Sequence, residues 1–293
     1  MAVMKHDAEL ALDAHAVLGE GCLWDAGAQR LIWVDITQGQ VHRSDVASGR
    51  TESTSVGQHV GAVALRRDKP GLALALRDGY GLLTDAGVEI IAPVCAENPK
   101  VRMNDGKPDR AGRFWAGTMA YDQAPGAGTL YRLDADRTAT TMLQGVTISN
   151  GLDWTPDDRL MYYIDTPTHR VDAFAFDAER GLLGERRPVV EIPRGEGSPD
   201  GMTLDADGGL WVAHWGGSRV CHYLPDGRLD CEVLLPVSQV SCCCFGGPDL
   251  DTLFITTASS GLSPEQLAAE PHAGGVFACR PGATGRPPFR YGG

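Results

Sequence analysis

The chain repeats one pattern of polar and hydrophobic positions six times. Each copy has a polar turn rich in Gly, Pro or Asp, followed by a short aromatic and aliphatic run, which is typical of a hairpin leading into a buried strand. The copies are DAGAQRLIWVD, RDKPGLALALRD, DRAGRFWAGT, TPDDRLMYYID, DADGGLWVAH and GPDLDTLFIT. Their aligned residues are Trp33, Leu74, Trp115, Tyr163, Trp211 and Phe254, at intervals of 41, 41, 48, 48 and 43 residues. Such a period matches one blade of a β-propeller.

Further apolar segments complete the repeat. One precedes each turn, as in GCLWD, VGAVALR and SNGLDW, and one follows it, as in GYGLLTD, GTLYRLD and HRVDAFAFD. VEIIAPV, RPVVEI and DCEVLL supply a fourth strand. The pattern therefore predicts an all-β fold, a six-bladed β-propeller with four antiparallel strands per blade, formed by residues 1–293 as a single domain.

The constant period favours this fold over its alternatives. A β-sandwich or two smaller β domains would also show short strands and frequent turns, but not one internal order at a near-constant interval. We expect the N-terminal segment AELALD to lie beside the last blade and close the ring, so that no sheet edge stays open there. Helix should be scarce, and SPEQLAAE (263–270) is the best candidate, with Ser263 as its N-cap.

Polar residues recur at fixed positions in four repeats. Counted back from the aligned residue of their own repeat, they are Glu20 and Asn150 at 13 positions, and Asn104 and Asp200 at 11 positions. The first strand of a blade lies beside the central channel, so these side chains should meet at one mouth of that channel. Arg102 lies two residues before Asn104 and should share its face of the strand.

Two carboxylates and two amides in a partly desolvated channel are costly unless a partner satisfies them, and a divalent cation would do so. Their oxygen donors suit Ca²⁺, Mg²⁺ or Mn²⁺, while Zn²⁺ or Fe²⁺ could bind with lower selectivity. Asn or Asp before Gly also forms ordinary turns, and Glu20 could be a solvated loop residue. The matched offsets favour a binding site. Arg102 is a candidate donor to substrate hydroxyls or a carboxylate, or it forms a salt bridge at the rim.

The charge of the chain limits its partners. It has 38 acidic and 26 basic residues and a formal net charge of -12, without a basic block, so nucleic acid and anionic membranes are poor candidates. The N-terminal stretch lacks an apolar region with a cleavage site, and no run of about 18 apolar residues occurs. We therefore expect a soluble, cytoplasmic protein that binds a small molecule; its oligomeric state is left open.

Eight cysteines include the run Cys242, Cys243 and Cys244. We interpret them as free buried thiols, because an even count in a chain of this size does not establish disulfides. Adjacent strand residues face opposite ways, so the three cannot all bind one metal, and no zinc site is assigned to them. Their role is left open. We also assign no role to His59 and His214, and we interpret Asp105 as structural.

Five motifs together resemble the SMP-30/gluconolactonase/LRE family of six-bladed propellers. They are LGEG (18–21), RMNDGKPDRAGRFWAGTM (102–119), SNGLDWTPD (149–157), SPDGMTLDADGGLWVA (198–213) and CFGGPDLDTLFITTA (244–258). They extend over most of the chain in the expected order. Cys22 and Arg110 stand where many members have proline, and the segment 121–128 is short where some relatives have a longer lid loop, which bears on the rim and on substrate choice.

The resemblance implies a role for each residue. Glu20, Asn150 and Asp200 would bind one divalent metal, Arg102 and Asn104 would contact substrate or a metal-bound water, and Asp200 would also be the general base. The implied activity is a metal-dependent hydrolase of carbohydrate metabolism that opens a sugar lactone to the sugar acid. The alternatives are a related hydrolase of other lactones or of phosphotriesters, and a non-catalytic propeller that binds metal or protein.

Overall fold

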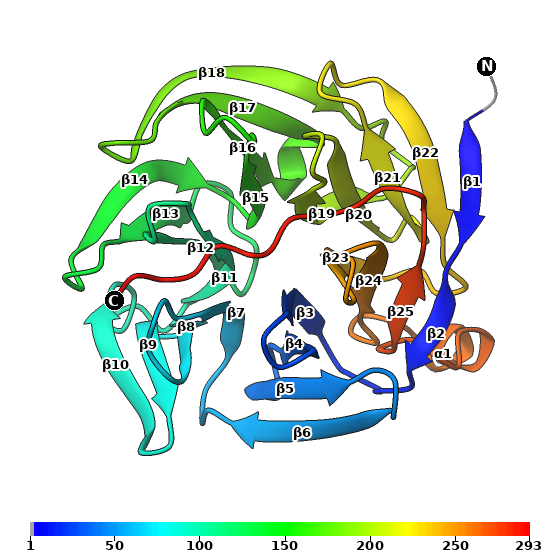
Figure 1. Ribbon diagram of the computed structural model, residues 1–293, viewed down its shortest axis with the longest axis horizontal. Helices are drawn as coiled ribbons and strands as arrows, with labels where there is room; N and C mark the ends of the chain where they lie inside the picture. Colours follow the sequence, from blue (N-terminus) through cyan, green and yellow to red (C-terminus); the bar gives the residue numbers. More distant parts are fainter. Residues whose placement is uncertain (1–2) are drawn as a thin grey trace.

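The computed structural model describes residues 3–293 and confirms the six-bladed β-propeller predicted from the sequence (Figure 1). Six sheets surround a central channel, and the first strand of each blade is the innermost one, in contact with the first strands of neighbouring blades.

The first three blades each have four antiparallel strands in simple order. Blade 1 contains β3 (Gly19–Asp25), β4 (Arg30–Asp35), β5 (Gln40–Asp45) and β6 (Arg50–Ser55). Blade 2 contains β7 (Val60–Leu65), β8 (Leu72–Leu76), β9 (Gly79–Thr84) and β10 (Gly87–Pro93). Blade 3 contains β11 (Val101–Pro108), β12 (Phe114–Ala120), β13 (Gly128–Leu133) and β14 (Ala139–Val146).

The last three blades keep this order, and blades 5 and 6 also receive a strand from the N-terminal segment. Blade 4 contains β15 (Ser149–Trp154), β16 (Leu160–Asp165), β17 (Arg170–Asp177) and β18 (Leu182–Glu191), with a 3-10 turn at Thr166–Thr168. Blade 5 contains β19 (Ser198–Leu204), β20 (Leu210–Trp215), β21 (Arg219–Tyr223) and β22 (Leu229–Leu234). Blade 6 contains β23 (Val240–Gly246), β24 (Thr252–Thr257) and β25 (Val276–Cys279).

The N-terminal segment closes the ring, as predicted. β2 (Glu9–Leu12) pairs antiparallel with β25 and forms the outer strand of blade 6. The sequence did not indicate a second addition: β1 (Met4–Asp7) pairs parallel with β22 and gives blade 5 a fifth strand. Each pairing covers backbone groups that would otherwise lie at an open sheet edge.

The predicted helix is also confirmed. α1 (Pro264–Ala269) begins after Ser263, whose side chain accepts a hydrogen bond from the backbone of Gln266 in a capping box. Within residues 3–293, none of the helices is long and apolar enough to cross a membrane.

The aligned aromatic and aliphatic residues lie on the second strand of each blade and are buried. They pack between neighbouring blades, for example Trp115 of blade 3 against Trp154 of blade 4, with ring centroids 6.0 Å apart. Buried indoles need a partner for their N–H group. Trp115 Nε1 donates to Asp109 Oδ2 and Trp211 Nε1 donates to Asp205 Oδ2, each at 2.9 Å. The same six-residue spacing thus gives the same contact in blades 3 and 5.

The C-terminal segment crosses the middle of the ring from blade 6 toward blades 2 and 3 (Figure 1). Its anchor is Tyr291, which is fully buried in the core shared by those blades. The Tyr291 hydroxyl donates to the backbone oxygen of Asp134 at 3.0 Å, and its backbone N–H donates to Leu65 at 2.8 Å. The segment therefore covers one end of the channel and is held by packing on the far side of it.

We expect Tyr291→Ala to reduce the free energy of unfolding by about 3 kcal/mol or more, because it leaves a cavity in a buried core. Tyr291→Phe is the matched control. It removes only the hydroxyl hydrogen bond and should cost about 1 kcal/mol. Urea unfolding of the two variants and the wild type measures both values. Equal stability of the alanine variant and the wild type would show that the segment is not anchored there.

Candidate functional site

Register shifts near the start of the inner strands set the direction of the site side chains. In β3 the shift lies between Glu20 and Leu23, and β11, β15 and β19 have shifts at the corresponding places. A bulge places an extra residue in one strand and re-aims its side chain. The side chains predicted to face the channel lie in or beside these shifts, which explains why they recur at fixed offsets.

Glycines beside the site let the inner strands approach one another. A Cβ atom on Gly61 would lie 2.2 Å from the backbone oxygen of Asn104, and one on Gly151 would lie 2.7 Å from that of Asp200. Both distances are too short for a real contact, so these positions require glycine for space. The Asn150-Gly151 and Asp200-Gly201 pairs, which could have formed turns, lie inside β15 and β19, and a glycine directly after the polar residue is a further sequence signal of the site.

All five predicted site residues line one cavity of about 410 Å³ at one mouth of the channel. The five residues are between 4% and 7% exposed: Glu20, Arg102, Asn104, Asn150 and Asp200. They come from blades 1, 3, 4 and 5, and the fold brings them together although they are up to 180 positions apart (200 − 20) in the chain. The cavity size lies in the range of small-molecule sites, roughly 300–1,000 Å³.

A chain of hydrogen bonds fixes the polar groups of the site. Arg102 Nη1 donates to Asn104 Oδ1 at 2.6 Å, and Asn104 Nδ2 donates to Asn150 Oδ1 at 3.0 Å and to the backbone oxygen of Ser149 at 2.8 Å. Asn150 Nδ2 donates to Thr166 Oγ1 at 2.7 Å. Both amide groups are therefore oriented, and Asn150 Oδ1 keeps a second lone pair for a ligand.

Burial raises the pKa of the carboxyl groups in and beside this site. Glu20 is raised from 4.5 to about 8 by burial and by the charge of Asp105. The pKa of Asp200 is raised well above its usual range by burial and by Glu20 and Asp105. Burial lowers the pKa of Arg102, the nearest cationic group that offsets these charges. The protein alone therefore leaves the negative charge of the site poorly compensated.

The donor chemistry fits a hard divalent cation. Glu20 and Asp200 offer carboxylate oxygens to the cavity and Asn150 offers an amide oxygen, and this set of three contains no sulfur or imidazole donor. A cation would reduce the repulsion between the buried carboxylates. Arg102 and Asn104 lie beside this set and can donate hydrogen bonds to a bound molecule.

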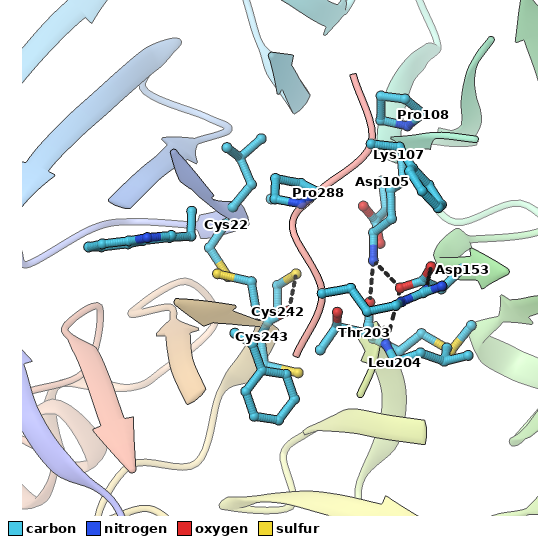
Figure 2. Close-up of a pocket in the computed structure, with 18 of the residues that line it drawn as sticks. Cys22, Asp105, Lys107, Pro108, Asp153, Thr203, Leu204, Cys242, Cys243 and Pro288 are labelled. Carbon is cyan, nitrogen blue, oxygen red and sulfur yellow. Dashed lines mark hydrogen bonds and ion pairs between the residues drawn. The ribbon is translucent and has the colours of Figure 1, made fainter. Parts of the chain in front are cut away.

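A second, enclosed cavity of about 60 Å³ lies further along the channel, next to the C-terminal segment (Figure 2). Asp105 lines this smaller cavity and not the larger one, as expected for a neighbour of Asn104 that faces the other way. Lys107 Nζ donates to Asp153 Oδ2 at 2.9 Å beside it (Figure 2). Asp105 still acts on the site, since its charge raises the pKa of Glu20 and Asp200, and the sequence did not show this.

His59 and His214, to which the sequence assigned no role, lie in different environments. His59 lines the larger cavity, where its Nδ1 lies 2.9 Å from the hydroxyl of Tyr121. His214 is fully buried, and its ring contacts the backbone oxygen of Glu196 and the hydroxyl of Tyr223. Tyr121, Thr166 and Trp215 also line the cavity, and no repeated offset in the sequence indicated them.

The eight cysteines are free thiols, and seven of them are buried. Cys242 and Cys244 pack in one core cluster and Cys243 in another, as the alternation of faces predicted. Cys22 lies beside Cys242 at the smaller cavity (Figure 2). Burial raises the pKa of Cys22 and Cys243, so the thiols are held in their neutral form.

The protein is thus a six-bladed propeller with a carboxylate and amide site at one mouth of its channel. The chain belongs to the SMP-30/gluconolactonase/LRE-like family, whose sequence model matches residues 18–259.

Relatives match this chain over nearly its whole length. A Bacillus subtilis (strain 168) protein provisionally named sugar lactone lactonase YvrE is 39% identical over 98% of this chain and 99% of its own. Regucalcin of Gallus gallus is 40% identical over 94% of this chain and 95% of its own. The crystal structure of a calcium-binding protein, regucalcin from Agrobacterium tumefaciens strain C58, has a TM-score of 0.93 at 28% identity and 99% coverage of both chains.

We expect the metal-free protein to lose stability as the pH rises from about 4.5 to about 8. The pKa of Glu20 is raised in the folded chain, so below pH 4.5 the folded and unfolded states are both protonated and the full stability is present. Above that value the unfolded chain releases its proton first, and stability is lost through the folded pKa of about 8. Asp200 acts in the same direction.

Urea unfolding at a series of pH values in the presence of a chelator measures this loss. Glu20→Gln should flatten the profile, and an excess of Ca²⁺ should restore stability to the wild type at high pH, since a ligand that binds the folded state stabilises it. A wild-type profile that matches that of the glutamine variant would contradict the assignment of this carboxyl as uncompensated.

Proposed function

We propose that the protein is a metal-dependent carboxylic ester hydrolase that opens a sugar lactone to the corresponding sugar acid. The observation that carries the proposal is the convergence of Glu20, Asp200, Asn150, Asn104 and Arg102 in one cavity of about 410 Å³. Membership of the family and similarity to a relative provisionally named a sugar lactone lactonase support the reaction class.

Glu20, Asn150 and Asp200 would hold one divalent cation. Their oxygen donors favour Ca²⁺, Mg²⁺ or Mn²⁺ over Zn²⁺ or Fe²⁺, and Ca²⁺ is further supported by the similar regucalcin described as a calcium-binding protein. When bound, such an ion supplies Lewis-acid stabilisation of the negative charge that develops on the lactone carbonyl oxygen.

Asp200 is proposed as the general base. Its carboxylate accepts a proton from the attacking water as the water oxygen bonds to the carbonyl carbon. The bond from that carbon to the ring oxygen then breaks, and the ring oxygen takes the proton to give a hydroxy acid. Arg102 and Asn104 orient the sugar hydroxyls, because both side chains reach the cavity and are held by their mutual hydrogen bond.

The cavity wall also has an apolar part. Leu18, Ile36, Met119, Ile148 and Trp215 also line the cavity. A sugar lactone has hydroxyl groups on its edges and C–H groups on its ring faces, so it matches a wall of mixed polarity. We further propose a cytoplasmic location, where the eight free thiols would remain reduced.

A panel of pentono- and hexonolactones tests the reaction. Metal-stripped protein is supplied with Ca²⁺, Mg²⁺, Mn²⁺, Zn²⁺ or Fe²⁺ in turn, and acid release is followed at neutral pH. We expect one lactone to be opened well above its spontaneous rate, and only with metal. Folded, metal-loaded protein that opens none of them would favour another ester or phosphotriester, or a non-catalytic calcium-binding propeller.

Asp200→Asn tests the assignment of the base. The amide keeps an oxygen donor but cannot accept the proton, so we expect kcat to fall about 100-fold or more, with a smaller loss of metal affinity. Asp207→Asn is the matched control, since Asp207 is an exposed residue of the adjacent turn. Lactone kinetics and metal titration of both variants provide the measurement. Retention of full activity in Asp200→Asn would eliminate this mechanism.

A further inference from the structure

Blade 5 carries a second group of metal-binding side chains, separate from the channel site. His222 lies on β21, and Asp230 and Cys231 lie on β22. A ring nitrogen of His222, a carboxylate oxygen of Asp230 and the Cys231 sulfur all lie within 4.8 Å of one another. This is the one such group of three among residues 3–293. The proposed lactone reaction uses none of the three.

The strand register explains how consecutive residues reach one point. His222 pairs with Cys231 and Tyr223 pairs with Leu229, so Asp230 is the extra residue of a bulge. Without the bulge, Asp230 and Cys231 would face opposite sides of the sheet. His222 Nδ1 lies 3.1 Å from Asp230 Oδ2. Two donors that each bind one zinc ion at about 2.0–2.2 Å in tetrahedral geometry lie about this far apart.

The other ring nitrogen of His222 already has a carboxylate neighbour. Nε2 lies 3.1 Å from Asp205 Oδ2, and the ring stacks on Trp211 with centroids 4.4 Å apart. A Cβ on Gly209 would lie 2.1 Å from Nε2, so this glycine provides the space for the ring. Nδ1 is the ring nitrogen that lies next to Asp230. Histidines that bind metals commonly have a carboxylate on the second nitrogen, which fixes the ring.

Blade 3 has a related arrangement, which shows which of the contacts in blade 5 are common to the fold. There the equivalent aspartate, Asp109, contacts Trp115 and is paired with Arg113 at 2.6 Å. A cation beside the Asp–Trp pair is thus a feature of the scaffold. That feature accounts for a charged partner of Asp205, but it does not account for the Asp230 carboxylate at Nδ1 or for the Cys231 thiol close to the ring.

We propose that His222, Asp230 and Cys231 form a zinc-binding site with a fourth position open to water. A donor set of nitrogen, sulfur and oxygen suits a borderline ion such as Zn²⁺, whereas the channel site offers oxygen donors for a harder ion. His222 and Cys231 are buried and Asp230 is exposed, so an ion can reach the site from the surface at Asp230. The inference does not depend on the lactone reaction.

A proton competes with the metal at this site. Burial alone would lower the pKa of His222, but Asp205, Cys231 and Asp230 raise it to about 10. In the metal-free protein this ring lies between the carboxylates of Asp205 and Asp230. A metal binds the deprotonated forms of a histidine nitrogen and a cysteine sulfur, so zinc binding at this site would release protons to the solvent.

Cobalt is the probe, because Co²⁺ occupies zinc sites and its bond to a thiolate gives a charge-transfer absorption in the near ultraviolet. Metal-stripped full-length protein is titrated with Co²⁺ in the presence of excess Ca²⁺, which occupies the channel site, and then with Zn²⁺. We expect the thiolate band to appear with one equivalent of Co²⁺ and to disappear when Zn²⁺ displaces it. The proposal is overturned if the wild-type protein shows no thiolate band and excess Ca²⁺ abolishes its zinc binding.

Three variants assign the band to this site. Cys231→Ser should abolish it, while Cys279→Ser, a matched change of a thiol on β25, should leave it unchanged. Asp230→Asn changes an exposed side chain and should fold normally, with zinc affinity reduced at least about 10-fold and lactone turnover unchanged. If the band persists in folded Cys231→Ser, or if Asp230→Asn binds Zn²⁺ as tightly as the wild type, the site is not formed by these residues.

Discussion

The burial of Glu20 and Asp200 at one mouth of the channel is the constraint on which the rest of the site depends. Each carboxylate is about nineteen-twentieths buried, and each raises the energy of the other in its charged form. A protein keeps such a pair when a ligand of opposite charge compensates it. The side chains of Asn104, Asn150 and Arg102 lie beside the carboxylates but do not neutralise them. A bound cation is the simplest physical explanation for two carboxylates buried in this way.

The propeller can bring these polar side chains together because they come from four different blades. In these four blades the inner strand supplies one or two polar side chains at its bulge. The second strand beside it contributes to an apolar core, for example with the buried Trp115 and Trp211. Glycines such as Gly61 and Gly151 let neighbouring inner strands pack backbone to backbone. The ring that carries the site is closed by β2 and covered at its other end by the C-terminal segment.

Repetition also gives one scaffold several local chemistries. The spacing of Asp109 to Trp115 recurs in Asp205 to Trp211, and the two pairs make the same hydrogen bond. Their cationic partners differ, arginine in blade 3 and histidine in blade 5. A histidine ring has a second nitrogen that can bind a metal, whereas an arginine guanidinium has only donors and forms an ion pair. The same position in the fold can therefore contribute to a metal site in blade 5 but not in blade 3.

Several features could be predicted from the sequence, because they depend on local periodicity and on equal offsets within repeats. They are the repeat, the blade number, the helix at Ser263 and the convergence of Glu20, Arg102, Asn104, Asn150 and Asp200. The sequence did not reveal β1 on blade 5, the influence of Asp105, the cavity residues Tyr121 and Thr166, or the meeting of His222 with Asp230 and Cys231. Those features depend on contacts between blades and on bulges that shift the register by one residue. They could not be predicted, because neither a contact between two blades nor a one-residue register shift in a single blade gives a repeated pattern along the chain.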